Sequence, residues 1–156
     1  MSQSLSTYCR YIILVITFFA ISFNAKAQTE TLTTGSFIIN MGATNPNTVA
    51  NGLRPYGLIY DLMRNHNVPI KWVISQTKVK DGVDFTYSGV QYKGGTFIIP
   101  AEFRSAAVNA KITTWVTSGV VGITTTSPLT VDVSQTLTAI PKWTLDDKNG
   151  AKAEAY

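Results

Sequence analysis

Cysteine and histidine are almost absent from this chain. Of its 156 residues, one is cysteine and one is histidine. Cys9 precedes an apolar run that we expect to be removed on export, so the remaining chain has no thiol for a disulfide, for thiol catalysis or for a zinc site. His66 stands alone at the predicted end of a helix, where an imidazole more often caps carbonyl groups than takes part in catalysis. We therefore predict no catalytic residue, no metal site and no cofactor.

Charge is also scarce, and it is not clustered. Charged residues make up 14% of the chain and hydrophobic residues 45%, a balance typical of a folded protein. If residues 1–27 are removed, Arg10 and Lys26 leave with them, and 11 of the 13 basic residues remain against 9 acidic ones. Without a cluster of Lys and Arg we predict no nucleic-acid partner, and membrane contact only through the N-terminal segment.

The N-terminus has the pattern of an export signal. Tyr11–Phe23 is an apolar run of 13 residues, shorter than the roughly 20 residues that a membrane span needs. Ala25 and Ala27 occupy the −3 and −1 positions of a cleavage site, so residues 1–27 are predicted to be a signal peptide and Gln28 the first mature residue. We expect a secreted or cell-surface protein. An uncleaved signal anchor is the alternative.

The mature chain is one domain long. A polar lead-in is predicted over residues 28–35, followed by a single α/β domain over residues 36–156. Three short apolar runs, Phe37–Met41, Ile70–Ile74 and Thr96–Ile99, predict the buried strands of that domain.

A helix is predicted between the first two of these strands. Apolar residues recur there at three- and four-residue spacing; they are Val49, Leu53, Tyr56, Tyr60 and Met63, with Ile59 and Leu62 beside them. Asn45-Pro46 is a possible beginning, and Pro55 predicts either a kink or a helix that starts there. Strand, helix and strand with short joints predict a right-handed unit with parallel strands. Loops 42–47 and 75–82, at the carboxyl ends of these strands, are then the expected functional loops.

A β-hairpin is predicted between the second and third strands, with Ser88-Gly89 as its two-residue turn. Its pairing places Phe85 opposite Tyr92 and Tyr87 opposite Val90, so apolar side chains share one face. We expect this face to turn toward the domain, so that the hairpin forms a lid over the carboxyl edge of the sheet; the alternative is an exposed patch for a ligand or partner.

The remaining chain predicts further elements of the same domain. Ala101–Ser118 has an imperfect helical spacing that ends at Gly119, Val120–Ile123 predicts a fourth strand, and Leu129–Thr138 favours extended structure. A last apolar segment covers Ile140–Leu145.

Four residues are candidate contacts for a ligand or partner: Asn45, Trp72, Tyr87 and Tyr92. Asn45 lies in the loop where α/β proteins hold phosphate at a helix N-terminus, although neither phosphate-binding glycine motif is present. The three aromatic residues could stack on sugars, but aromatic residues in strands usually fill the core. The alternative for all four residues is therefore a structural role without ligand contact.

The stretches RPYGLIYDLMRNHNVPIKWVI and DFTYSGVQYKGGTFIIPAEF resemble a module at the start of large secreted or surface proteins of Bacteroidetes-type bacteria. Some of those proteins have gliding-motility-type C-terminal sorting domains. More distantly, the stretches resemble glutamine-amidotransferase-like α/β domains. The resemblance covers residues 37–156 and implies that KWTLDDKNGAKAEAY opens a helix that continues beyond Tyr156. Amidotransferases use a Cys-His-Glu triad, and the mature chain has no cysteine, so that activity does not carry over.

These observations predict an α/β domain with a mainly parallel three-layer sheet, flavodoxin- or amidotransferase-like, with an inserted β-hairpin and an incomplete C-terminus. The expected function is that of a non-catalytic module of an exported or cell-surface protein, with a role in surface structure or adhesion. The alternatives are a hydrolase of amidotransferase-like fold whose active residues lie beyond Tyr156, and a carbohydrate-binding module. The expected partners are a surface glycan or other domains of the same polypeptide.

Overall fold

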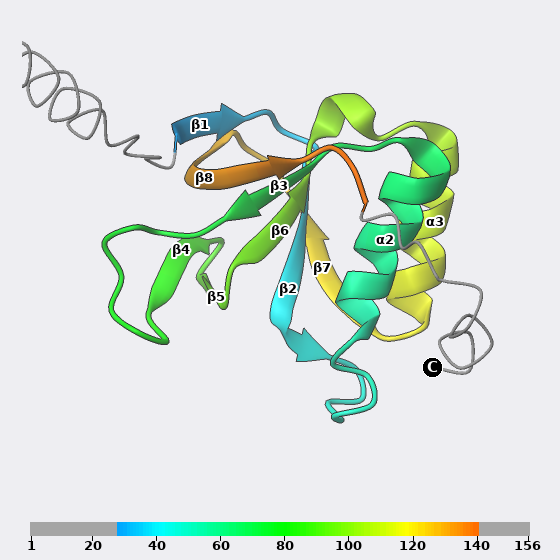
Figure 1. Ribbon diagram of the computed structural model, residues 1–156, viewed down its shortest axis with the longest axis horizontal. Helices are drawn as coiled ribbons and strands as arrows, with labels where there is room; N and C mark the ends of the chain where they lie inside the picture. Colours follow the sequence, from blue (N-terminus) through cyan, green and yellow to red (C-terminus); the bar gives the residue numbers. More distant parts are fainter. Residues whose placement is uncertain (1–27, 141–156) are drawn as a thin grey trace, which may run out of the picture.

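One six-stranded sheet forms the centre of the domain in the computed structural model, which describes residues 28–140 (Figure 1). Every pair of neighbouring strands in this sheet is antiparallel. In spatial order the strands are β1 (Gln28–Leu32), β8 (Leu129–Leu137), β3 (Ile70–Val73), β6 (Thr96–Ile99), β2 (Phe37–Thr44) and β7 (Val120–Thr124). Residues 28–32 of the expected polar lead-in thus form an edge strand.

The predicted parallel sheet is wrong, and strand β6 explains why. The three apolar runs do lie side by side, in the order β3, β6, β2. β2 and β3 each pair with β6 in an antiparallel sense, so they point the same way, as a strand–helix–strand unit requires, but they are not neighbours. The connection through α2 leaves one strand position open between β2 and β3. Strand β6, which comes later in the chain, occupies that position.

Two strand–helix–strand units, β2-α2-β3 and β6-α3-β7, interleave to form this part of the sheet. The order of elements β2, α2, β3, β6, α3, β7 and the strand order β3-β6-β2-β7 correspond to the ferredoxin-like split βαβ topology. β1 and β8 extend this sheet beyond β3, and the hairpin is inserted between β3 and β6. The flavodoxin- or amidotransferase-like fold is therefore corrected to an antiparallel one.

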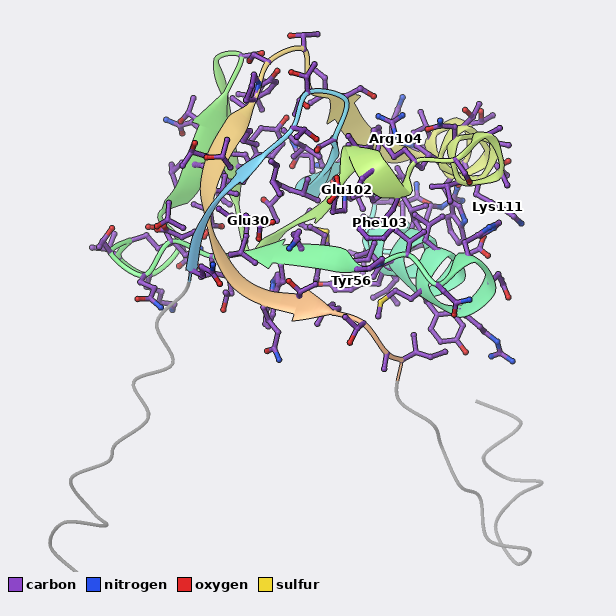
Figure 2. All side chains as sticks on the ribbon, turned by 90° about the horizontal axis from the view of Figure 1, so that it is seen from above. Glu30, Tyr56, Glu102, Phe103, Arg104 and Lys111 are labelled. Atoms are coloured by element: carbon purple, nitrogen blue, oxygen red, sulfur yellow. The ribbon has the colours of Figure 1, made fainter. Side chains whose placement is uncertain are left out.

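Both helices cover the same face of the sheet. They are α2 (Arg54–His66) and α3 (Ala106–Thr117), with a short 3-10 turn, η1 (Ala101–Phe103), before α3. Viewed from above, the two helices lie side by side at the right of the sheet (Figure 2). Their buried residues, with Phe37, Ile39 and Phe97 of the sheet, form the first core cluster.

Helix α2 starts at one of the two positions predicted from the sequence and not at the other. The helix starts at Arg54 with Pro55 in its first turn, as one of the two alternatives for Pro55 expected, and not at Asn45-Pro46. The face predicted to be buried was also wrong in part. Val49 and Leu53 precede the helix and are 97% and 73% exposed. The buried residues of the helix are Pro55, Leu58, Ile59, Leu62 and Met63, so Ile59, Leu62 and Met63 of the predicted set are buried as expected.

The hairpin covers the opposite face of the sheet. Strands β4 (Val83–Tyr87) and β5 (Val90–Lys93) are joined by Ser88-Gly89, and both turn residues have positive φ, as a tight hairpin turn of this kind needs. The predicted pairing of Phe85 with Tyr92 and of Tyr87 with Val90 is confirmed. Tyr87 and Tyr92 are buried in a second core cluster, with residues such as Ile38, Val73 and Ile98. The expectation that these rings face the domain is therefore confirmed, but the hairpin covers a face of the sheet and not its carboxyl edge, and Val90 is 42% exposed.

The predicted signal peptide and the last apolar segment, apart from Ile140, lie outside the described residues. The helix that the resemblance implies at the end of the chain also lies outside the described residues.

Candidate binding surface

The four candidate contact residues do not form one site. Asn45 is exposed, and its backbone N–H donates to the Gly119 carbonyl at 2.8 Å. Trp72 is half-buried on the helix side of the sheet, where its ring stacks on Phe97 with 5.9 Å between centroids. Tyr87 and Tyr92 lie together in the core on the hairpin side. Two of the four therefore fill the core, as the structural alternative held.

The two expected functional loops do meet, although the sheet is antiparallel. Gly42 of the first loop and Lys78 and Asp81 of the second line one cleft of about 310 Å³. β2 and β3 point the same way, so the segments that follow them reach the same end of the sheet. The remaining lining residues are Met41, Tyr56, Lys93 and Gly94.

An irregularity in β2 accompanies its approach to this cleft. Ile39 pairs with Gly122, but the next pair on β7 joins Thr44 to Val120, so β2 has three more residues between the two pairs than β7. Such a bulge bends its strand and redirects side chains. Met41 and Gly42 fall within it.

A buried carboxylate holds the second loop against the hairpin. The side chain of Asp84 is fully buried, and its two oxygens accept from the backbone N–H groups of Ser75 and Gly95, each at 3.0 Å. Lys78 Nζ lies 2.6 Å from the same carboxylate. Three donors thus compensate the burial of one charge, which would otherwise be costly. Asp84 therefore ties Ser75 and Lys78 of the 75–82 loop to Gly95, the residue just before β6.

Tyr56 forms one wall of the cleft. Its ring makes an edge contact with Phe97, with 6.2 Å between centroids and 74° between planes, and Phe97 in turn stacks on Trp72. The residue is nevertheless 53% exposed. Tyr56 lies in the first turn of α2. An aromatic ring is thus held by the core while a large part of it is open to a ligand or partner.

Two further apolar side chains, Val49 and Leu53, are exposed on the segment that precedes Tyr56 in the chain. We call Val49, Leu53 and Tyr56 the apolar row. The loop that carries Val49 is ordered by Asn51, a buried residue whose side-chain amide donates to the Pro46 carbonyl at 2.8 Å. Apolar groups presented by an ordered loop are a feature of contact surfaces.

A second hollow lies on the other side of Tyr56, along α2. It measures about 350 Å³, and its lining is almost wholly apolar or aromatic: Tyr56, Ile59, Tyr60, Met63, Leu137, Ala139 and Ile140. Tyr60 is 45% exposed, and its hydroxyl accepts a hydrogen bond from Arg64. We call this hollow the α2 groove.

The hydroxyl of Tyr87 is the most strongly perturbed ionisable group described. It accepts from the backbone N–H of Thr126 at 2.7 Å and of Ser127 at 3.2 Å, and it lies within 3.4 Å of both their side-chain hydroxyls. Hydrogen bonds from Ser127 and Thr126 lower the pKa of Tyr87 to about 7. This phenol joins the hairpin to the β7–β8 loop and lies in the core, away from the cleft.

Sequence reasoning found the two loops but missed the side chains that make the cleft. Tyr56 has the helical spacing of a core residue, and nothing in the sequence separates it from Met63, which is buried. Lys78 and Lys93 are lysines in polar stretches with no motif around them. The glycine pair after Lys93 was the available signal, because Gly94 and Gly95 both have positive φ and turn the chain at the cleft.

Comparisons with protein-family models, with curated proteins and with solved structures returned no match. Within residues 28–140, no group of three or more His, Cys, Asp or Glu side chains is placed to hold a metal ion. Neither helix of that part is long and apolar enough to cross a membrane. The resemblance to surface-protein modules stays a prediction.

Proposed function

We propose that this chain is an exported, non-catalytic domain that acts by binding, with a role in surface structure or adhesion. The observation that carries the proposal is the apolar row. Val49 and Leu53 are 97% and 73% exposed on an ordered segment that leads to Tyr56, a residue that lines the cleft. Burying such a side chain in an interface contributes about 1.5–3 kcal/mol, so two or three of them can supply the centre of a specific contact.

The partner that this surface fits best is another folded protein domain of the cell surface, including other domains of the same polypeptide. Its contact area would have an apolar hollow for Val49 and Leu53 and polar groups for the rim of the cleft. Lys93 and Asp81 lie on that rim and are exposed, so they favour a partner with mixed charge.

Binding of the labelled mature domain to the surface of the cells that export it tests the proposal. The double variant Val49→Ser, Leu53→Ser should bind at least about tenfold more weakly, since 1.4 kcal/mol corresponds to a factor of ten. Its melting temperature should not change, because both side chains are already in water. Val90→Ser with Val116→Ser is the matched control, since these side chains are exposed but lie elsewhere.

Two results would count against the proposal. One is a wild-type domain that does not bind the cell surface. The other is an affinity loss that is the same for the control pair as for Val49→Ser, Leu53→Ser.

A carbohydrate ligand is the second candidate, favoured by Tyr56 and Lys93 on one cleft. An aromatic ring beside an amine suits a sugar with an acidic group. Lys93→Gln separates the two candidates, because it should abolish binding of an acidic glycan and should only modestly weaken an apolar protein contact. Loss of binding to glycosidase-treated cells would favour the glycan.

A further inference from the structure

The α2 groove is an apolar hollow on the surface of the described part of the chain, and that part ends inside it. Leu137, the last residue of β8, pairs with Ile70, just after the end of α2. Three residues later Ile140 lines the same groove as Tyr56, which lies in the first turn of α2. The end of the described chain therefore lies against α2, and Figure 1 shows the end of β8 turning down beside this helix.

We infer that residues 141–145, PKWTL, occupy the α2 groove and that Trp143 is the side chain that fills it. Ile140 already packs against the first core cluster, so the segment enters the groove with its first apolar residue in place. Pro141 disfavours a helical conformation at Ile140 and keeps the chain extended there.

The lengths agree with this placement. Three extended residues carry the chain about 10 Å from Ile140 to Trp143. Tyr56 and Met63, which line the groove on α2, are seven helical steps apart, and this distance is also about 10 Å, so Trp143 can reach any part of the groove. Trp143 is the first large apolar residue after Ile140, and Leu145 follows two positions later, on the same side of an extended chain. A hollow of about 350 Å³ is large enough for an indole ring.

Two competing occupants are a second copy of the chain and an apolar segment of another protein. The chain's own segment has the advantage, because it is tethered at the edge of the groove and its effective concentration there is far above that of a free molecule. The other two tryptophans are already engaged: the indole of Trp72 donates to the Gly95 carbonyl and that of Trp115 to Asp61.

Nuclear magnetic resonance of the mature chain, residues 28–156, tests the inference directly. The indole signal of Trp143 is the one that Trp143→Phe removes. It should show nuclear Overhauser contacts to the Met63 methyl group and to the Tyr60 ring. Absence of both contacts would overturn the inference. A sample that mixes labelled and unlabelled chains separates a contact within one molecule from a contact between two, and a contact seen only between molecules would also overturn it.

Thermal unfolding gives an independent readout. Trp143→Ala should lower the melting temperature by about 3–6 °C, the shift that roughly 1 kcal/mol produces in a domain of this size. Lys142→Ala is the matched control and should leave it unchanged. In a double-mutant cycle, Tyr60→Ala should cost less in the Trp143→Ala background than in the wild type, because the two side chains would be in contact. Additive effects would contradict the contact. None of these readouts depends on Val49 or Leu53, so the inference and the proposed function can fail separately.

Discussion

The two faces of the sheet are covered by different means. On one face, α2 and α3 bury a wide apolar cluster but leave the α2 groove and the ring of Tyr56 open. On the other face, a two-stranded hairpin without a helix buries Tyr87 and Tyr92, and polar groups fasten it. Asp84 holds the base of the hairpin, and the hydroxyl of Tyr87 holds the strand end beside its turn.

The difference follows from the geometry of the two covers. A helix satisfies its own backbone hydrogen bonds, so it needs only apolar packing to stay on the sheet. An isolated two-stranded hairpin is marginally stable in water and needs further contacts to hold its place. The hairpin side should therefore be sensitive to the loss of single polar groups, and the helix side to changes of shape.

Replacement of Asp84 should have the largest effect. Asp84→Ala leaves Lys78 without its carboxylate and two backbone N–H groups without an acceptor, and breaking a buried pair in this way costs about 3–5 kcal/mol. Asp84→Asn should cost less, because its amide oxygen can still accept from one N–H group. Urea unfolding monitored by circular dichroism measures both.

Asp61 on the helix side provides the matched comparison. Its carboxylate accepts from the Trp115 indole at 2.9 Å, and Lys111 lies 3.7 Å away with its side chain 46% exposed. The hydrogen bond from Trp115 is the main reason that the pKa of Asp61 is lowered. Asp61→Ala should cost about 1–2 kcal/mol, as expected for a hydrogen bond to a partly exposed charged group. Equal losses of unfolding free energy for the Asp61 and Asp84 variants would contradict the expected difference between the two faces.

A smaller effect is expected where the two helices meet. A Cβ atom at Gly57 would lie 2.5 Å from the ring of Trp115. Alanine is normally favoured over glycine inside a helix, but overpacking of this kind costs about 1–3 kcal/mol, so Gly57→Ala should be destabilising.

The effect of Gly57→Ala on stability should change sign when the ring of Trp115 is removed. In the Trp115→Ala background, Gly57→Ala should raise the melting temperature relative to Trp115→Ala alone, because only the helix preference remains. A Gly57→Ala variant more stable than the wild type would show that the helix side tolerates a change of shape.

Local patterns in the sequence predicted the elements better than their arrangement. The Ser88-Gly89 turn determines its own pairing, because positive φ at both positions and alternating apolar residues are properties of neighbouring residues. The place of β6 between β2 and β3 depends on contacts between distant parts of the chain, and no short pattern encodes it. The candidate surface depends on α2 starting at Arg54, which leaves Leu53 outside the helix, although its spacing fits a helical face.

The smallest effect, and the one most specific to the hairpin side, concerns pH. The pKa of Tyr87 in the folded protein is about 7, below its ordinary value of 10.0, so ionisation of this phenol favours the folded state. The contribution of this ionisation to the unfolding free energy grows as the pH rises from about 7 and is complete above about 10. It is lost as the pH falls through 7. The pKa of Tyr92 is raised by burial and by the charge of Tyr87, so Tyr92 opposes the gain above pH 10.

The comparison of the wild type with Tyr87→Phe at two pH values isolates this contribution. The difference in unfolding free energy should be larger at pH 9 than at pH 6, because only the wild type gains from an ionised phenol there. Tyr56→Phe makes the same chemical change at an exposed ring and is the matched control. Absorbance at 295 nm should show one tyrosine that ionises near pH 7 in the folded wild type and not in Tyr87→Phe. If both variants respond to pH alike, the hydroxyl of Tyr87 acts only as a neutral hydrogen-bond acceptor, and the hairpin is held on the sheet by Asp84 and by packing.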